Sequence, residues 1–365
     1  MPDVPDPARL ACPLPWTDAD RVLLGHGSGG KLTADLIDNL FVPAFRNDTL
    51  AALEDQAVLP WDDGTDGGDG SGGGAAPRLA FTTDSFVVRP LFFPGGDIGT
   101  LAVHGTVNDL AVGGAVPLFL SAALILEEGL PMADLKRIVA SMSRACAEAG
   151  VQLVTGDTKV VDRGNADGVF ITTSGVGRVP AGRSLSIRNA RPGDRALVSG
   201  TIGDHGVAVL SVREGLEFET VLESDSAPLH DLARAVLDAG PATRCMRDPT
   251  RGGLSSALNE LAAASGVGVR IDEAAIPVRP EVQAACELLG LDPLYVANEG
   301  KLIAVVPAAE ADAVLEAMRA HPLGTDAAIV GEVVADHPGR VIQRSVVGGE
   351  RIVATLAGEQ LPRIC

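Results

Sequence analysis

The chain repeats one alternation of strand-like and helix-like segments in two halves of similar size. The clearest helical segment is Met132–Glu148, where Leu135, Ile138 and Met142 follow the spacing of one helical face. A polar, turn-rich stretch around Val179–Asp194 separates the halves. A chain of 365 residues is too long for one ordinary core. The pattern therefore predicts an α+β protein of two domains, without a long parallel βαβ series.

Short apolar runs bounded by turn residues predict strands, and amphipathic runs predict helices. In the N-terminal half the predicted strands are Ala57–Pro60, Leu79–Phe81, Phe86–Val88, Pro117–Leu126, Val151–Val154 and Val169–Ser174, and a further helix is Ile98–Ala111. In the C-terminal half the predicted strands are Ala196–Ser199, Val267–Ile271, Leu302–Val306, Ala327–Val334, Arg340–Gln343 and Arg351–Leu356, and the predicted helices are Leu229–Ala239 and Gly253–Ala263.

The domain boundaries follow from composition. We expect a disordered lead over residues 1–19, an N-terminal domain over 20–180, a C-terminal domain over 190–345 and a mobile tail over 346–365. Residues 62–77 are mostly Gly and Asp. Because the ligand register of an EF-hand is absent there, we interpret this segment as a flexible insert.

Composition excludes several classes of function. Aromatic residues make up 3% of the chain and hydrophobic residues 46%, so the cores must be mostly aliphatic. The net charge of −19 argues against a nucleic-acid partner. Five cysteines without a CxxC spacing indicate neither a disulfide framework nor a zinc site. The longest apolar stretch, Ala115–Leu126, is too short to span a bilayer, and no signal segment is evident. These features predict a soluble, cytoplasmic protein without a membrane partner.

The last residue of the chain is a cysteine, Cys365. A thiol with no chain after it can enter a crevice that a mid-chain cysteine cannot reach. Pro362 stiffens the approach, and the eight residues from Gly358 span roughly 26 Å when extended. The alternatives are an arm that carries a group to an active site and a frayed terminus that happens to end in Cys.

Acidic residues occur in five short clusters that we expect at strand ends and helix starts. They contain Asp55, Asp84, Asn108 with Asp109, Asp157 and Asp248. Carboxylates on loops of one face can hold Mg²⁺ against phosphate oxygens. The alternative for each cluster is a helix cap or a turn.

A glycine-rich run, Gly25–Lys31, precedes an expected helix near Leu32 and contains His26. Backbone N–H groups at such a helix start suit a phosphate, although the run is not a Walker A motif. His26 is a candidate base or phosphate contact. Lys159 and Glu299 are further candidates, and each could equally be an ordinary surface charge.

Taken together, these segments resemble one family, from about Val22 to the last residue. The segments that carry the resemblance are Phe81–Ser85, Phe93–Gly99, Gly105–Leu110, Gly156–Val160, Arg247–Gly253 and Pro362–Cys365. The family is HypE, the [NiFe]-hydrogenase maturation proteins of the aminoimidazole ribonucleotide (AIR) synthetase-like superfamily. The Pro-rich lead and the Gly/Asp insert depart from the usual pattern, but neither touches a motif.

The resemblance implies a two-domain AIR synthetase-like chain that forms a homodimer through its N-terminal sheets and holds ATP and Mg²⁺. It also implies that a HypF-type carbamoyltransferase loads a carbamoyl group onto Cys365. ATP-dependent dehydration then produces a thiocyanate, and the cyanide passes to iron on a HypC–HypD complex. The alternatives are a selenophosphate synthetase-type enzyme and a non-enzymatic adaptor. The glycine-rich loop carries His26 where such synthetases usually carry a reactive Cys, and Cys12 lies well upstream.

The resemblance also implies roles for individual residues. Glu299 is the expected base and Lys159 neutralises developing charge, while His26 closes over the phosphates with the glycine loop. The expected metal ligands are Asp55, Asp84, Asp109 and Asp248. The expected nucleotide-binding residues are Gly27, Ser28, Gly29, Gly30, Asp84, Asn108, Asp157, Lys159 and Arg251.

Overall fold

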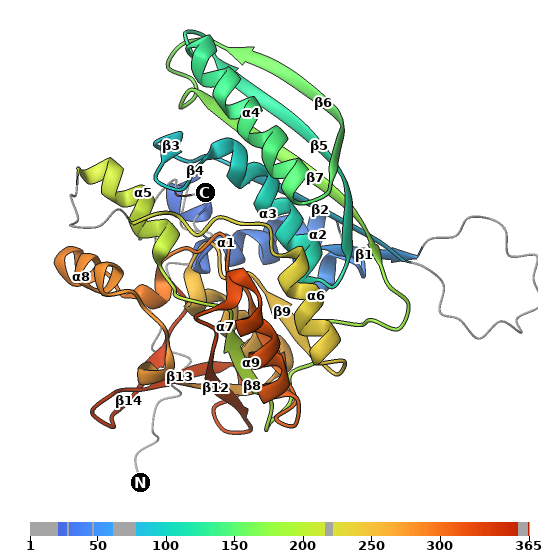
Figure 1. Ribbon diagram of the computed structural model, residues 1–365, viewed down its shortest axis with the longest axis vertical. Coiled ribbons are helices and arrows are strands. Elements are labelled where there is room, and N and C mark those ends of the chain that lie inside the picture. The colour runs from blue at the N-terminus through green and yellow to red at the C-terminus, as the bar shows by residue number, and fades with distance from the viewer. Residues whose placement is uncertain are drawn as a thin grey trace, which may run out of the picture.

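The computed structural model describes residues 21–27, 29–45, 47–60, 78–215, 222–356 and 364. The expected lead 1–19, the insert 62–77, Ser28 and Cys365 lie outside these residues. Figure 1 shows two α+β units, with the N-terminal unit at the top and the C-terminal unit at the bottom of the view. The predicted two-domain α+β class is confirmed.

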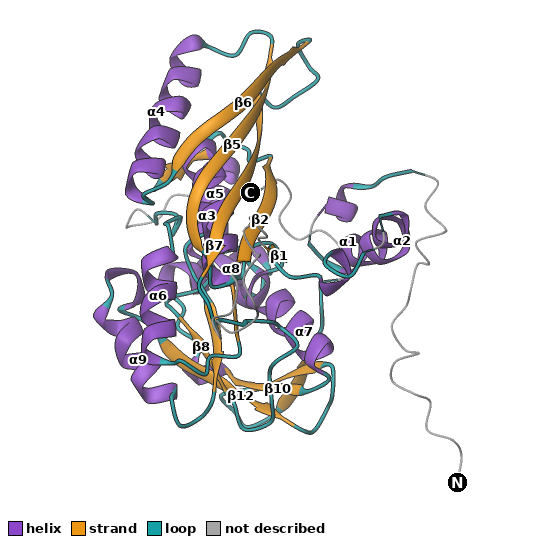
Figure 2. Cartoon of the chain, turned by 90° about the vertical axis from the view of Figure 1, so that its right-hand side faces the viewer, coloured by secondary structure: helices purple, strands orange, loops and turns teal. Residues whose placement is uncertain are grey.

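The N-terminal unit is built on a curved sheet with helices on one side. Among the described residues its strands run in the order β1 (Ala57–Pro60), β2 (Arg78–Phe86), β7 (Val169–Val179), β5 (Val116–Glu127) and β6 (Gln152–Val161). Only β5 and β6 pair in parallel, since α4 (Met132–Glu148) connects them as a crossover. Figure 2 shows α4 on one side of this sheet. The two-residue strands β3 (Phe92–Phe93) and β4 (Gly96–Asp97) lead into α3 (Ile98–Val112).

The C-terminal unit is a second sheet with helices on both faces. Among the described residues its strand order is β14 (Glu350–Val353), β13 (Arg340–Arg344), β10 (Gly268–Asp272), β12 (Ala328–Val334), β8 (Arg195–Val198), β11 (Ile303–Val306) and β9 (Cys245–Arg247). Alternate residues of β8 serve the two faces. Val198 packs in the cluster of α7 (Gly253–Ser265), and Leu197 packs in the cluster of α6 (His230–Ala239) and α9 (Ala311–Ala320).

The other four α-helices of the described residues are α1 (Lys31–Leu36), α2 (Val42–Ala44), α5 (Asp204–Glu214) and α8 (Pro280–Leu289). A π-helical turn over Ile37–Phe41 joins the first two. Among the described helices, none combines the length and apolar character needed to cross a lipid bilayer.

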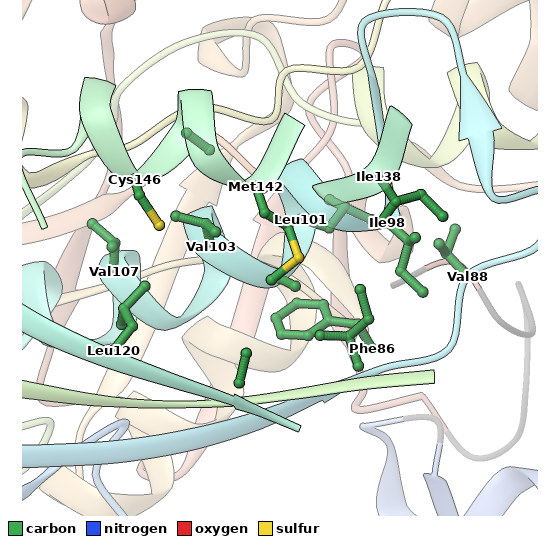
Figure 3. Close-up of a cluster of buried hydrophobic side chains, with 14 of the residues drawn as sticks. Phe86, Val88, Ile98, Leu101, Val103, Val107, Leu120, Ile138, Met142 and Cys146 are labelled. Carbon is green, nitrogen blue, oxygen red and sulfur yellow. The ribbon is translucent and has the colours of Figure 1, made fainter. Parts of the chain in front are cut away.

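Helix α3 is the centre of the molecule. Thirteen of its fifteen residues are buried, so it lacks the polar face of a surface helix. One side packs with the N-terminal sheet and α4 in the cluster that Figure 3 shows, where Leu101 and Met142 lie above Phe86. A Cβ at Gly105 would come within 2.8 Å of the Phe86 ring, so only glycine permits this approach. The C-terminal end of α3 joins the cluster of α6 and α9 through Val112.

Several boundaries differ from the predictions. Residues 79–81 and 86–88 were expected as separate strands, but β2 is continuous over Arg78–Phe86 because Asp84 and Ser85 are accommodated within the ladder to β7. Strand β6 continues past Val154 to Val161, because it pairs with β5 along this whole length. The sequence pattern did not reveal α5, α9 or β9. Strand β14 is part of the sheet, so the expected tail begins after it.

The placement of the acidic clusters also needs correction. Asp84 and Asp157 lie inside strands and Asp109 lies in the last turn of α3, whereas strand ends and helix starts were expected. Asp55 precedes β1 and Asp248 follows β9, as expected. A polar residue on one face of a strand or helix does not interrupt the pattern of apolar residues on the opposite face. The sequence pattern therefore did not show that these aspartates lie inside strands and a helix.

Asp97 fixes the start of α3 and predicts a stability effect. Its Oδ1 accepts hydrogen bonds from the N–H of Gly99 at 2.8 Å and of Thr100 at 3.0 Å, and from the Ser141 hydroxyl of α4 at 2.6 Å. We expect Asp97→Ala to lower the free energy of unfolding by about 2 kcal/mol, measured by urea denaturation. Asp97→Asn should cost less, because the amide oxygen still accepts. Asp312→Ala, on an exposed position of α9, is the control and should change stability by less than about 0.5 kcal/mol. Equal effects of Asp97→Ala and Asp312→Ala would contradict this role.

Candidate functional site

A cavity of about 770 Å³ lies where the two domains meet, and it is large enough for a nucleotide-sized ligand. The wall of this cavity contains six of the predicted site residues, which come from both halves of the sequence. They are Gly29, Gly30, Asp55, Asp109, Asp248 and Arg251.

Three carboxylates of the cavity that the sequence predicted come from separate elements. Asp55 lies before β1, Asp109 on α3 and Asp248 after β9. Arg247, beside Asp248 in sequence, places its Nη2 3.0 Å from Asp55 Oδ1 and 2.7 Å from Glu260 Oε2. The hydroxyl of Thr82 donates to Asp109 Oδ2 at 2.8 Å. Arg247 therefore bridges two carboxylates of the wall, which also contains Arg188 and Arg251.

Burial and mutual repulsion raise the pKa values of these acids. Burial raises the pKa of Asp55 to about 6 against the lowering effect of Arg247. Burial, with the charge of Asp55, raises the pKa of Asp248 to about 7. The pKa of Asp109 is raised well above its ordinary value by burial and by three neighbouring carboxylates. Such a cluster binds protons when empty and favours a cation ligand.

Asp84 belongs to the same electrostatic group. Burial raises the pKa of Asp84, and the charge of Arg251 opposes part of this rise. The Oδ1 of Asp84 accepts a hydrogen bond from the N–H of Ser85 at 2.7 Å. Its charge in turn contributes to the raised pKa of Asp109 and Asp248.

The glycine-rich loop packs against the C-terminal domain at the cavity. Arg251 Nη1 donates to the carbonyl of Gly27 at 2.9 Å, and Lys31 N–H donates to the carbonyl of Leu356 at 2.9 Å. A Cβ at Gly30 would lie 2.4 Å from that Leu356 oxygen, so glycine is required for the contact. His26 Nδ1 instead accepts the N–H of Leu23 at 3.0 Å, a local turn contact.

Glu299 is buried in the loop that follows α8, with 3% of its surface exposed. Its Oε1 has no hydrogen-bond partner among the described residues. Its pKa is raised well above the ordinary value by burial, and further by the charges of Asp84, Asp225 and Asp248. A buried carboxyl group with a raised pKa and an unpartnered oxygen can exchange a proton with a ligand.

The loop of Glu299 is held by buried polar contacts. Its N–H donates to Asp225 Oδ1 at 3.0 Å, and Asp225 forms an ion pair with Lys301 at 3.1 Å. Burial acts to raise the pKa of Asp225, but Lys301, a buried histidine and this N–H bring it below its ordinary value. Asn298 donates to the carbonyl of Pro249 at 2.9 Å, which ties the loop to the segment of Asp248.

Asn108 has a bridging position rather than an open one. Its amide nitrogen lies 3.1 Å from the carbonyls of both Ala227 and Glu299, and its oxygen accepts the N–H of Leu229 at 2.8 Å. These contacts join α3 to the C-terminal domain. The side chain thus orients the Glu299 loop.

Lys159 and Asp157 lie away from the cavity in a single chain. Both are on the edge strand β6, exposed, and paired with each other at 2.7 Å. The Lys159 side chain is 70% exposed.

Five residues of the site were not predicted from the sequence: Arg247, Glu260, Thr82, Asp225 and Lys301. Arg247 and Thr82 lie within the motifs Arg247–Gly253 and Phe81–Ser85, which were the available signals. The described residues contain no group of three His, Cys, Asp or Glu side chains arranged to hold a metal ion by themselves.

Two family models match the chain. Residues 54–179 match the N-terminal domain of the AIR synthase related proteins, and residues 191–344 match their C-terminal domain.

Individual relatives are similar over nearly the whole chain. Carbamoyl dehydratase HypE of Cupriavidus necator is 59% identical over 345 residues, which cover 94% of this chain and 95% of the relative. The crystal structure of a HypE–HypF complex contains a chain 49% identical with a TM-score of 0.80, covering 88% of this chain and 99% of that one. The hydrogenase maturation protein HypE in complex with ATP is 48% identical with a TM-score of 0.76, covering 94% and 100%. The chain therefore belongs to the AIR synthase related proteins and, among them, to the HypE carbamoyl dehydratases.

Proposed function

We propose that this chain uses ATP to dehydrate a carbamoyl group carried on Cys365, leaving a thiocyanate as the source of a cyanide ligand for hydrogenase iron. Relatives named carbamoyl dehydratase and a relative solved with ATP support the proposal. The observation that carries it is the buried Glu299 carboxyl beside an acidic cavity, with Ile364, the residue before Cys365, buried in the same apolar cluster as Ala297.

The chemistry has two parts. Phosphorylation of the carbamoyl oxygen by ATP creates a good leaving group and releases ADP. Loss of phosphate and of both nitrogen protons then forms the carbon–nitrogen triple bond. Glu299 is the base for an N–H proton, since a carboxylate of raised pKa is a stronger base than an ordinary one. Its burial also keeps water away from the activated group.

Magnesium is part of the proposal. The donor set of Asp55, Asp109 and Asp248 is made only of hard carboxylate oxygens, and their pKa values are raised first by burial and then by neighbouring carboxylates. Mg²⁺ commonly takes one or two carboxylates and completes its shell with phosphate oxygens and water, so a site with three converged side chains is not required. These residues, with Asp84, fit that role. The ion would supply charge neutralisation for phosphoryl transfer.

The proposed partners rest on the family and on one exposed surface of the N-terminal sheet. The HypE–HypF structure supports a HypF-type carbamoyl donor, and a HypC–HypD-type complex is the proposed acceptor. Phe81 of β2 and Phe119 of β5 lie in one row across the open face of the N-terminal sheet, each over 40% exposed. A second copy that covers this face would form the homodimer and would bring exposed charges such as Lys159 against another subunit.

The function is tested by intact-mass analysis after incubation with the carbamoyl donor system. We expect one carbamoyl group to appear on Cys365 and one water to be lost from it only when ATP and Mg²⁺ are both present. Cys365→Ala should remain unmodified and still bind ATP. Loss of water without ATP, or modification of the Cys365→Ala variant, would refute the proposal.

Glu299→Gln tests the base. The amide keeps the shape but cannot accept the proton, so we expect the rate of water loss to fall by about 10²- to 10⁴-fold while nucleotide binding persists. Glu287→Gln, an exposed substitution on α8, is the matched control. The rate is measured by quenched intact-mass sampling. A wild-type rate in Glu299→Gln would exclude Glu299 as the base.

The charge of the cavity predicts a pH effect on stability without ligand. The pKa of Asp248 is about 7 in the folded chain, whereas its ordinary value, which applies to the unfolded chain, is 3.8. Between these pH values the folded state therefore holds a proton that the unfolded state lacks. This contribution to stability is lost as pH rises through that window. Asp248→Asn cannot lose a proton, so its stability relative to wild type should increase by about 2–4 kcal/mol from pH 4 to pH 8.

The measurement is urea denaturation in EDTA without nucleotide. Asp312→Asn serves as the control, with the same change at an exposed site, and should show no such increase. A difference between Asp248→Asn and wild type that stays constant across this pH range would contradict the predicted titration.

A further inference from the structure

The residue before the terminal cysteine is held firmly in the interior. Ile364 is 3% exposed and belongs to the apolar cluster that includes Phe93 and Ala297. Its carbonyl oxygen lies 2.7 Å from Nε2 of His205 on α5. A frayed terminus would show neither contact.

His205 is itself fully buried and oriented from its other side. Its Nδ1 lies 2.8 Å from the Ser224 hydroxyl, whose oxygen accepts the N–H of Ser226 at 3.1 Å. Ser224 N–H donates to the carbonyl of Pro94 at 2.8 Å, which anchors the loop beside α5. The Phe93 ring packs edge-on against the imidazole, with centroids 5.4 Å apart.

These contacts determine the tautomer of His205. The Ile364 carbonyl oxygen can only accept, so the ring proton is on Nε2, and Nδ1 of the neutral ring accepts from the Ser224 hydroxyl. Burial lowers the pKa of His205, although Asp225 and the Ile364 carbonyl act in the opposite direction. The ring therefore donates its Nε2–H to the tail carbonyl.

We propose that His205, oriented by Ser224, is a positioning residue that latches the C-terminal tail by its Ile364 carbonyl. The latch sets the fraction of time for which the tail is docked. Its catalytic consequence rests on the proposed function, which the latch deepens. When the tail leaves, the buried Nε2–H loses its acceptor, which favours return. A tail that must meet a donor enzyme outside and react inside needs such a reversible contact.

The latch is tested first by tail docking, without any turnover. The readout is the rate at which iodoacetamide alkylates Cys365, located by peptide mass mapping. His205→Phe keeps a ring but removes the donor, so we expect about three- to tenfold faster alkylation. His205→Gln places an amide N–H near the Nε2 position and should restore much of the protection. His205→Asn reaches only the Nδ1 position and should not.

A milder pair of variants covers the case in which His205→Phe does not fold. Ser224→Ala frees the ring and should speed alkylation. Ser226→Ala is the matched control: its hydroxyl lies 3.0 Å from Nδ1 of a different histidine, His104, and alkylation should stay at the wild-type rate. Equal rates in wild type, Ser224→Ala and any folded His205→Phe would overturn the latch, as would equal protection by the Gln and Asn variants.

Dehydration of carbamoylated protein separates this inference from the proposed function. The latch predicts that water loss slows in His205→Phe and Ser224→Ala in proportion to the loss of protection, and recovers in His205→Gln. A wild-type protein that never loses water refutes the proposed function whatever the alkylation rates show. Normal water loss in wild type with unchanged alkylation in the variants refutes only the latch.

Discussion

The burial of α3 on nearly all sides is the constraint on which the rest of the structure depends. A helix with no solvent face must be enclosed by both domains, and α3 packs with the first sheet along its length and with α6 and α9 at its end. Asp109 and Asn108 lie on the last turns of this helix. The same packing that stabilises the interface thus places a carboxylate in the cavity and an amide under the Glu299 loop.

The site buries several carboxylates, although carboxylates ordinarily favour contact with water. Four aspartates and Glu299 share one partly buried region, and Arg247 and Arg251 compensate only part of the charge. Burying these carboxylates together therefore costs stability. The tail contact differs from this site, because His205 binds an uncharged backbone carbonyl, that of Ile364.

Local pattern was a good guide where one face of an element is buried. The amphipathic helix Met132–Glu148 was predicted with its observed bounds, because the hydrophobic period is unbroken there. Elements such as α5 were missed, since its buried polar residues, Asp204 and His205, disguise an interior helix. The family resemblance was confirmed by relatives up to 59% identical, whereas the role of each site residue stays a prediction.

By itself the sequence determined the two-domain α+β class, the family and the set of acidic motifs, since these depend on composition, period and short motifs. Only the tertiary structure decided which motifs meet. It placed Asp55, Asp109 and Asp248 in one cavity, left Lys159 on an exposed edge strand and turned Asn108 towards backbone groups. It also brought His205 to a tail residue 159 positions away. Such contacts arise from how helices and sheets pack, and no local pattern in the sequence records the distance between residues so far apart.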